Sequence, residues 1–271
     1  ALLALSAQAH DNDPTGESPI GDAIEAAMTM ERSHARYFRD MQPGFRAVAR
    51  AAGAAPVADA ARSGAWSPVD DWPVLPVHAA LLPNGKVLAW DATPDDFGDD
   101  VHTTDRYETR VTVWDPETSD HLRTNNDTDT DLFCAGSALL WDGRVLFAGG
   151  DGGRQGKNGP LSNSNLYDPY SNTWTRTDDM TAPRWYSSVA ALGTGEMLTF
   201  GGAYTPTPIA EVFGFNKRWR GLPIATQYTF SGDYSWLQAT SDGDVMYFGP
   251  HDTLSRLDTT GKGTWTAGAP R

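Results

Sequence analysis

The feature that most constrains the fold of this chain is a repeated unit: an apolar run, a tight turn containing glycine, and a second apolar run. The unit occurs four times, at Leu81–Trp90, Leu139–Phe147, Ala191–Phe200 and Ala239–Phe248. Its turn glycines, Gly85, Gly143, Gly195 and Gly243, lie 58, 52 and 48 residues apart. Asp-Gly between alternating apolar residues, as at Asp142-Gly143, is the strongest short-range hairpin signal. The repeat therefore predicts a series of β-hairpins.

A second hairpin signal, rich in aromatic residues, closes each unit. These segments are Val111–Pro116, Leu166–Trp174, Val212–Trp219 and, more weakly, Leu257–Trp265. Two hairpins make a four-stranded sheet, and a period of about 50 residues with a Gly-Gly pair and a late tryptophan is typical of kelch-type propeller blades. We expect an all-β, kelch-type β-propeller with about four blades in this chain. Four-bladed rings exist, so counting alone does not require further blades.

The composition narrows the class of protein and of partner. Among 271 residues, 27 Gly and 18 Pro favour many short strands and turns over long helices. The formal charge of −14 argues against nucleic acid or an anionic membrane surface as a partner. No apolar run reaches the ~18–20 residues that a membrane-spanning helix needs.

The first 65 residues differ in texture from the repeats. Residues 1–9 read as the remnant of a signal peptide, with Ala7-Gln8-Ala9 as the cleavage site, although an ordinary apolar N-terminus is the alternative. Residues 10–65 read as a linker and a short helical arm, and residues 66–271 as a partial propeller. We therefore expect a secreted or cell-surface protein.

Cys134 is the only cysteine, so the chain has no internal disulfide. Cys134 and Tyr186 each open the first strand of a unit, and the innermost strands of a propeller line its channel. The thiol and the phenol should therefore lie side by side near the axis, where copper and oxygen could join them in a thioether. The alternatives are a small buried hydrophobic residue at Cys134 and an ordinary core or rim aromatic at Tyr186.

Several motifs resemble a known family. Phe133–Gly136 and Arg184–Tyr186, each followed by a blade strand and a Gly-Gly pair, resemble the copper radical oxidases, the family of galactose oxidase and glyoxal oxidase. Trp72–Pro83 is similar to the first-blade opening of bacterial members. The resemblance extends from about Trp66 to the end, and it implies that the four units are the N-terminal portion of a seven-bladed ring.

The resemblance also implies residue roles. Cys134 and Tyr186 would form a Tyr–Cys radical cofactor, Tyr186 would be an equatorial copper ligand, and Tyr204 would stack on the cofactor. Such a cofactor couples one-electron copper chemistry to a one-electron ligand radical. The implied reaction oxidises a primary alcohol or an aldehyde, carbohydrates included, with O2 and releases H2O2.

The sequence departs from the family in its copper ligands. The family's axial Tyr-His pair does not occur, and the six histidines show no ligand spacing: His10, His34, His78, His102, His121 and His251. Copper needs several N or O donors, which Tyr186 alone does not supply. We expect an inactive fragment of a longer enzyme. A non-catalytic kelch propeller that binds protein or glycan through its rim loops is the alternative.

Three further signals have plain interpretations. The acidic run through Asp127, Asp129 and Asp131 is expected to be a solvated turn, because the glycine that a calcium loop needs is absent. Arg184 is expected either to stabilise the channel face or to be solvated at the surface. His78 is expected to be a hydrogen-bonded core or channel residue.

Overall fold

A computed structural model describes residues 62, 64, 70–91, 109–152, 159–202, 209–226, 234–249 and 253–270. The chain divides into two compact units, Ala1–Asp71 and Trp72–Arg271. The predicted signal remnant and, apart from Arg62 and Gly64, the linker and helical arm lie outside the described residues.

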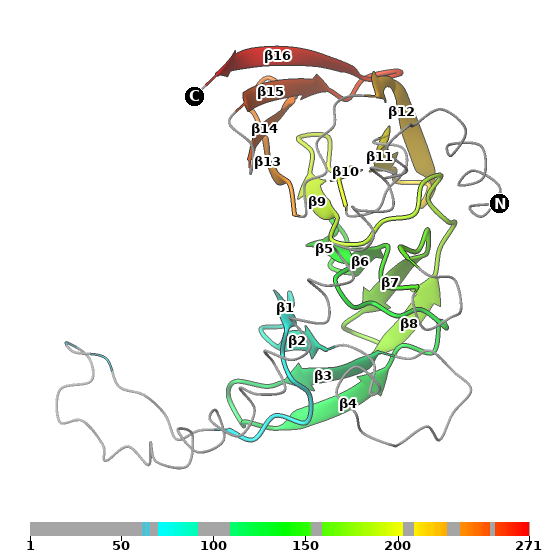
Figure 1. Ribbon diagram of the computed structural model, residues 1–271. Helices are drawn as coiled ribbons and strands as arrows, with labels where there is room; N and C mark the ends of the chain where they lie inside the picture. Colours follow the sequence, from blue (N-terminus) through cyan, green and yellow to red (C-terminus); the bar gives the residue numbers. More distant parts are fainter. Residues whose placement is uncertain are drawn as a thin grey trace, which may run out of the picture. The chain divides into compact units, whose positions relative to one another are not determined.

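The described residues of the second unit form four antiparallel sheets of four strands each (Figure 1). The first two sheets contain β1 (His78–Leu81), β2 (Val87–Trp90), β3 (Arg110–Trp114), β4 (His121–Asn125), β5 (Gly136–Leu139), β6 (Val145–Ala148), β7 (Ser164–Asp168) and β8 (Thr173–Arg176). The other two contain β9 (Ser188–Ala191), β10 (Met197–Phe200), β11 (Ile209–Phe213), β12 (Trp219–Thr226), β13 (Trp236–Ala239), β14 (Val245–Gly249), β15 (Thr253–Asp258) and β16 (Thr264–Pro270). The four predicted glycine-turn hairpins are confirmed as β1–β2, β5–β6, β9–β10 and β13–β14.

Successive sheets stack face to face, and the alternation of side chains along a strand shows how. In β6, Val145 and Phe147 pack in one core with residues of the first sheet, while Leu146 packs in another with Met197 and Phe213 of the third sheet. Because both faces of this sheet are covered, β6 is a continuous apolar run instead of an alternating one. A third core joins the last two sheets.

The late tryptophan of three units bonds to the sheet before its own. The Nε1 of Trp174 donates to Thr124 Oγ1 at 3.2 Å, that of Trp219 to Ser164 Oγ at 3.0 Å, and that of Trp265 to the carbonyl of Ala225 at 3.1 Å. Along the innermost strands, β5 contacts β9 and β9 contacts β13. The sheets and their stacking are those of a β-propeller-like fold.

Nowhere in the described residues does a helix have the length and apolarity that crossing a membrane requires.

Candidate functional site

Cys134 and Tyr186 occupy the same register position in neighbouring sheets. Each stands two residues before the innermost strand of its sheet, β5 or β9. Both have a left-handed backbone, with φ of 56° and 60°, which is uncommon for residues other than glycine. The N–H of Tyr186 donates to the carbonyl of Cys134 at 2.9 Å. The structure therefore brings the two predicted residues together.

Tyr234 is a third residue in this series, and it was not predicted from the sequence. It lies two residues before β13, it has a φ of 49°, and its N–H donates to the carbonyl of Tyr186 at 2.7 Å. The signal that identifies it is the offset itself. In the fourth unit, Tyr234 stands where Cys134 and Tyr186 stand in the second and third.

The side chains of Cys134, Trp185 and Tyr186 form one buried cluster. Cys134 is 4% exposed and Tyr186 is 9% exposed, and the ring centroids of Trp185 and Tyr186 are 4.4 Å apart. The ring of Tyr234 stands perpendicular to that of Tyr186 at 5.3 Å. Both phenols hydrogen-bond to the thiol of Cys134. A sulfur in contact with two phenols, shielded by an indole, is the chemical core of the site.

The surroundings hold the Cys134 thiol in its neutral form. Burial raises the pKa of this thiol to about 12, the hydrogen bonds from Tyr234 and Tyr186 oppose the rise, and the charges of Asp151 and Asp131 add to it. A free thiolate at Cys134 is therefore scarce at neutral pH.

Arg184 anchors the segment that carries Tyr186, and it is fully buried, so the expectation of surface solvation is wrong. Its Nη1 donates to the carbonyl of Gly201 at 3.0 Å, and its Nη2 donates to Glu211 Oε1 at 3.1 Å and to the carbonyl of Ile209. Both members of the ion pair have no exposed side-chain surface. A guanidinium carries a charge and five N–H donors, so its burial is unfavourable unless hydrogen-bond acceptors and an opposite charge lie beside it.

Glu211 binds the same segment from its other end. Its carboxylate accepts the backbone N–H of Thr181 at 2.7 Å and that of Ala182 at 3.1 Å. The segment from Thr181 to Tyr186 is thus held by a buried ion pair whose carboxylate lies on β11. This pair fixes the backbone from which the Tyr186 ring projects.

The Gly149-Gly150 pair after β6 is where the two segments of the site meet. A Cβ on Gly149 would overlap the carbonyl of Arg184, and a Cβ on Gly150 would overlap the carbonyl of Asp131. The N–H of Gly150 donates to the Arg184 carbonyl at 2.9 Å. Both glycines have positive φ, 88° and 140°. Only glycine allows the two segments that carry Cys134 and Tyr186 to approach the backbone at residues 149 and 150 so closely.

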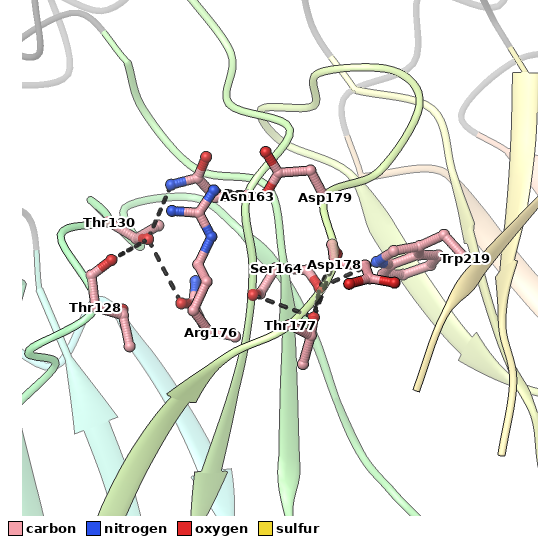
Figure 2. A network of polar contacts seen from close by, with 10 residues as sticks. Thr128, Thr130, Asn163, Ser164, Arg176, Thr177, Asp178, Asp179 and Trp219 are labelled. Carbon is pink, nitrogen blue, oxygen red and sulfur yellow. Dashed lines mark hydrogen bonds and ion pairs between the residues drawn. The ribbon is translucent and has the colours of Figure 1, made fainter. Parts of the chain in front are cut away.

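A buried polar network holds the segment that leads to Cys134. Figure 2 shows the amide of Asn163 directed at Thr130, whose Oγ1 it reaches at 2.9 Å. The next residue, Asp131, is fully buried, so the prediction that it belongs to a solvated turn is wrong. Its Oδ1 accepts the N–H of Phe133 at 2.9 Å and the hydroxyl of Thr109. The Asp131 carboxylate therefore holds the backbone next to Cys134 in place through a hydrogen bond.

A cavity of about 440 Å³ adjoins the site, and Tyr234 and His78 line it together with hydroxyl groups that include those of Ser187 and Ser235. The imidazole of His78 stacks on Trp90 with ring centroids 5.5 Å apart, and burial lowers its pKa to about 4. Its Nε2 has no hydrogen-bond partner in the part of the chain that the structure describes, which contradicts the expectation of a satisfied histidine.

The donor set for copper is incomplete in the described residues. No three His, Cys, Asp or Glu side chains converge there in a way that could hold a metal ion. Phenol oxygens such as that of Tyr186 suit copper, but a stable site needs several N or O donors. Tyr204, the residue expected to stack on the cofactor, lies outside the described residues.

The chain belongs to the copper radical oxidase family, as its similarity to curated proteins shows. Two galactose oxidases of Gibberella zeae are each 30% identical over 219 residues, which cover 74% of this chain and 30% of theirs. Among solved structures, a fungal alcohol oxidase of the AA5 family in complex with copper shares the fold, with a TM-score of 0.59 and 24% identity over 74% of this chain and 42% of that one. No family model matches the chain.

The chain thus spans about a third of the length of the curated relatives that it matches, since 30% of each is covered.

Proposed function

We propose that this chain is part of a copper radical oxidase that oxidises primary alcohols or aldehydes with O2 and releases H2O2. The observation that carries the proposal is the contact of the Cys134 thiol with the Tyr186 phenol in a buried cluster, in a chain related to galactose oxidases. The relatives' length supports a larger protein, in which the four sheets are part of a seven-bladed kelch-type ring. The signal-like residues 1–9 support a place of action outside the cytoplasm.

In this proposal Cys134 and Tyr186 become a thioether. The sulfur loses its hydrogen, a ring carbon next to the Tyr186 hydroxyl loses another, and one C–S bond forms. O2 takes the two electrons and two protons and leaves as H2O2, so atoms and electrons balance. Tyr186 would also supply one oxygen ligand to copper, which contributes one-electron redox chemistry when bound. The described residues do not complete the copper site, and the remaining ligands would come from other parts of the protein.

What the described residues do for this chemistry is positioning and protection. The Arg184–Glu211 pair holds the backbone before Tyr186, and the Gly149-Gly150 pair lets both segments meet. Trp185 covers the phenol and limits water access, which would protect a tyrosyl radical from side reactions.

The test is oxidative cross-linking, with copper(II) under air, of the longer protein that this proposal requires, because the described residues alone do not complete the copper site. Peptides that carry Cys134 and Tyr186 should appear joined, with the loss of two hydrogens by mass spectrometry. Cys134→Ser and Tyr186→Phe should each abolish the product, whereas Tyr170→Phe, at a side chain 70% exposed on a turn, should leave it unchanged. Unlinked peptides after full exposure to copper and air would rule the proposal out.

One observation favours the second candidate, a binding function on the turns of the propeller. Trp141 and Phe215 are 42% and 56% exposed, and their rings touch at 4.5 Å although they come from different sheets. An exposed apolar surface of this kind is a candidate contact for a sugar ring or an apolar protein side chain. The test is retardation of the protein in a gel that contains a soluble polysaccharide. Retardation of the unsubstituted protein that is lost in the double variant Trp141→Ala/Phe215→Ala would support this candidate. Equal migration of the two proteins would refute it.

A further inference from the structure

Tyr234 shares its backbone placement with the two residues of the proposed thioether. Cys134, Tyr186 and Tyr234 stand at one register position of three successive sheets, all with left-handed backbones. Two backbone hydrogen bonds, of 2.9 and 2.7 Å, join the three in a row. These main-chain bonds between sheets hold the backbone of the third residue at the site in the same way as that of the first two.

The side chain of Tyr234 contacts the reacting pair without being equivalent to Tyr186. Its hydroxyl hydrogen-bonds to the Cys134 thiol, and its ring meets Tyr186 edge to face at 5.3 Å. Tyr234 is 38% exposed and lines the adjoining cavity, whereas Tyr186 is 9% exposed and packs against Trp185. Of the two phenols on the sulfur, Tyr186 is the shielded one and Tyr234 the one open to the cavity.

We propose that Tyr234 is a positioning residue for thioether formation: its hydroxyl holds the Cys134 sulfur in place so that it couples to Tyr186. This inference rests on the proposed function. A cysteine side chain has one free rotation about its Cα–Cβ bond, so a buried thiol with a single partner would sample positions turned away from the ring. A second hydrogen bond, from Tyr234, restricts that rotation.

The coupling itself follows the balance given above: one S–H and one ring C–H of Tyr186 are lost, one C–S bond forms, and the oxidant takes two electrons and two protons. Tyr234 gains and loses nothing in this step. Its hydroxyl only directs the sulfur.

The experiment compares the rate of cross-linking, in the same longer protein, with two oxidants. One is copper(II) under air, and the other is a copper-free photochemical one-electron oxidant, a ruthenium tris-bipyridine complex with persulfate. Tyr234→Phe keeps the ring and removes the hydroxyl, and we expect the Cys134–Tyr186 product to form about tenfold more slowly with either oxidant, the loss of one hydrogen bond to sulfur. Tyr234→His restores a ring N–H donor and should recover most of the rate, which a purely structural role of the tyrosine would not predict. Tyr170→Phe is the matched control and should react like the unsubstituted chain.

Thermal unfolding of each variant shows whether the fold is kept. Equal rates for Tyr234→Phe and the unsubstituted chain would overturn the inference, and so would a product in which the sulfur is attached to residue 234. Cross-linking by the photochemical oxidant but not by copper and air would count against the proposed function alone, and the variants would then be judged in the photochemical arm. Cross-linking with neither oxidant would overturn both.

Discussion

Three side chains of the candidate site, those of Cys134, Tyr186 and Tyr234, are held by residues in left-handed conformations. Each such residue costs of order 1 kcal/mol relative to the ordinary regions of the backbone. The cost is met by the surrounding contacts, since the two inter-sheet hydrogen bonds and the packing of the cluster leave little room for another conformation. This strained conformation occurs at the same position in three sheets, just before the innermost strand, and it is therefore part of the construction of the site. Since these residues are not in a strand conformation, their side chains need not follow the alternation of the strand that comes after them.

At the scale of single residues, His78 should make the protein sensitive to acid. Its pKa is about 4 in the folded chain against 6.5 for a free imidazole, so the folded state penalises the charged form. The stability that this histidine contributes is complete above pH 6.5 and is lost as the pH falls toward 4, by about 3 kcal/mol. Urea unfolding at pH 7 and pH 4.5 measures this effect. Between the two pH values, His78→Phe should lose less of its free energy of unfolding than the unsubstituted protein.

The free energies of unfolding must be compared between the variant and the unsubstituted protein at each pH, because Asp91 changes the stability with pH in the direction opposite to His78. Burial raises the pKa of that carboxyl to about 6, against the lowering effect of Arg110, so its folded form becomes less stable as the pH rises from 3.8 to 6. An acid loss that is the same with and without His78 would contradict the prediction.

Gly149 gives a second prediction at this scale. Gly149→Ala adds a Cβ that overlaps the Arg184 carbonyl at a φ of 88°, so it should lower the free energy of unfolding by more than about 3 kcal/mol. Gly243→Ala is the matched control: its φ is 96°, and no atom lies within 4 Å of the added methyl. It should cost only about 1 kcal/mol, the conformational part. Similar losses in the two urea titrations would show that the close approach is unimportant.

At the scale of elements, the segment Thr181–Tyr186 depends on one buried ion pair. Removing one partner leaves an uncompensated charge, so Glu211→Leu and Arg184→Met should each destabilise the fold by about 3–5 kcal/mol. The double variant should lose less than the sum of the two, because neither charge is then left alone. A double-mutant cycle by chemical denaturation measures this coupling, and additive losses would mean that the pair does not act as a unit.

The hairpins could be predicted from the sequence because their signals are local. Asp142-Gly143 demands a tight turn whatever surrounds it, and the alternation on either side defines two strands. The proximity of Cys134 and Tyr186 was predictable for a related reason, since repeats place equivalent residues at equivalent positions. Arg184 was not predictable, because its partner Glu211 lies 27 residues away and only the packing of β11 brings them together. Tyr234 was overlooked although the same repeat rule identifies it.

At the scale of the whole molecule, the net charge of −14 should set the response to salt. Most of the acidic excess repels itself in the compact state, and salt at physiological strength screens charges beyond about 8 Å. Raising sodium chloride from low to moderate concentration should therefore increase the midpoint of thermal unfolding. The expected gain is of order 1 kcal/mol, and a decrease would show that attractive pairs such as Lys86–Asp115 outweigh the repulsion.

The row formed by Cys134, Tyr186 and Tyr234 also bears on how such chemistry can arise. Because three successive sheets offer a backbone position of the same conformation, a reactive centre can be composed by exchanging residue types at these positions, without new loops or a different topology. A scaffold of this kind is a natural starting point for engineering other side-chain pairs, for instance a histidine next to a thiol, with the geometry already supplied by the repeats.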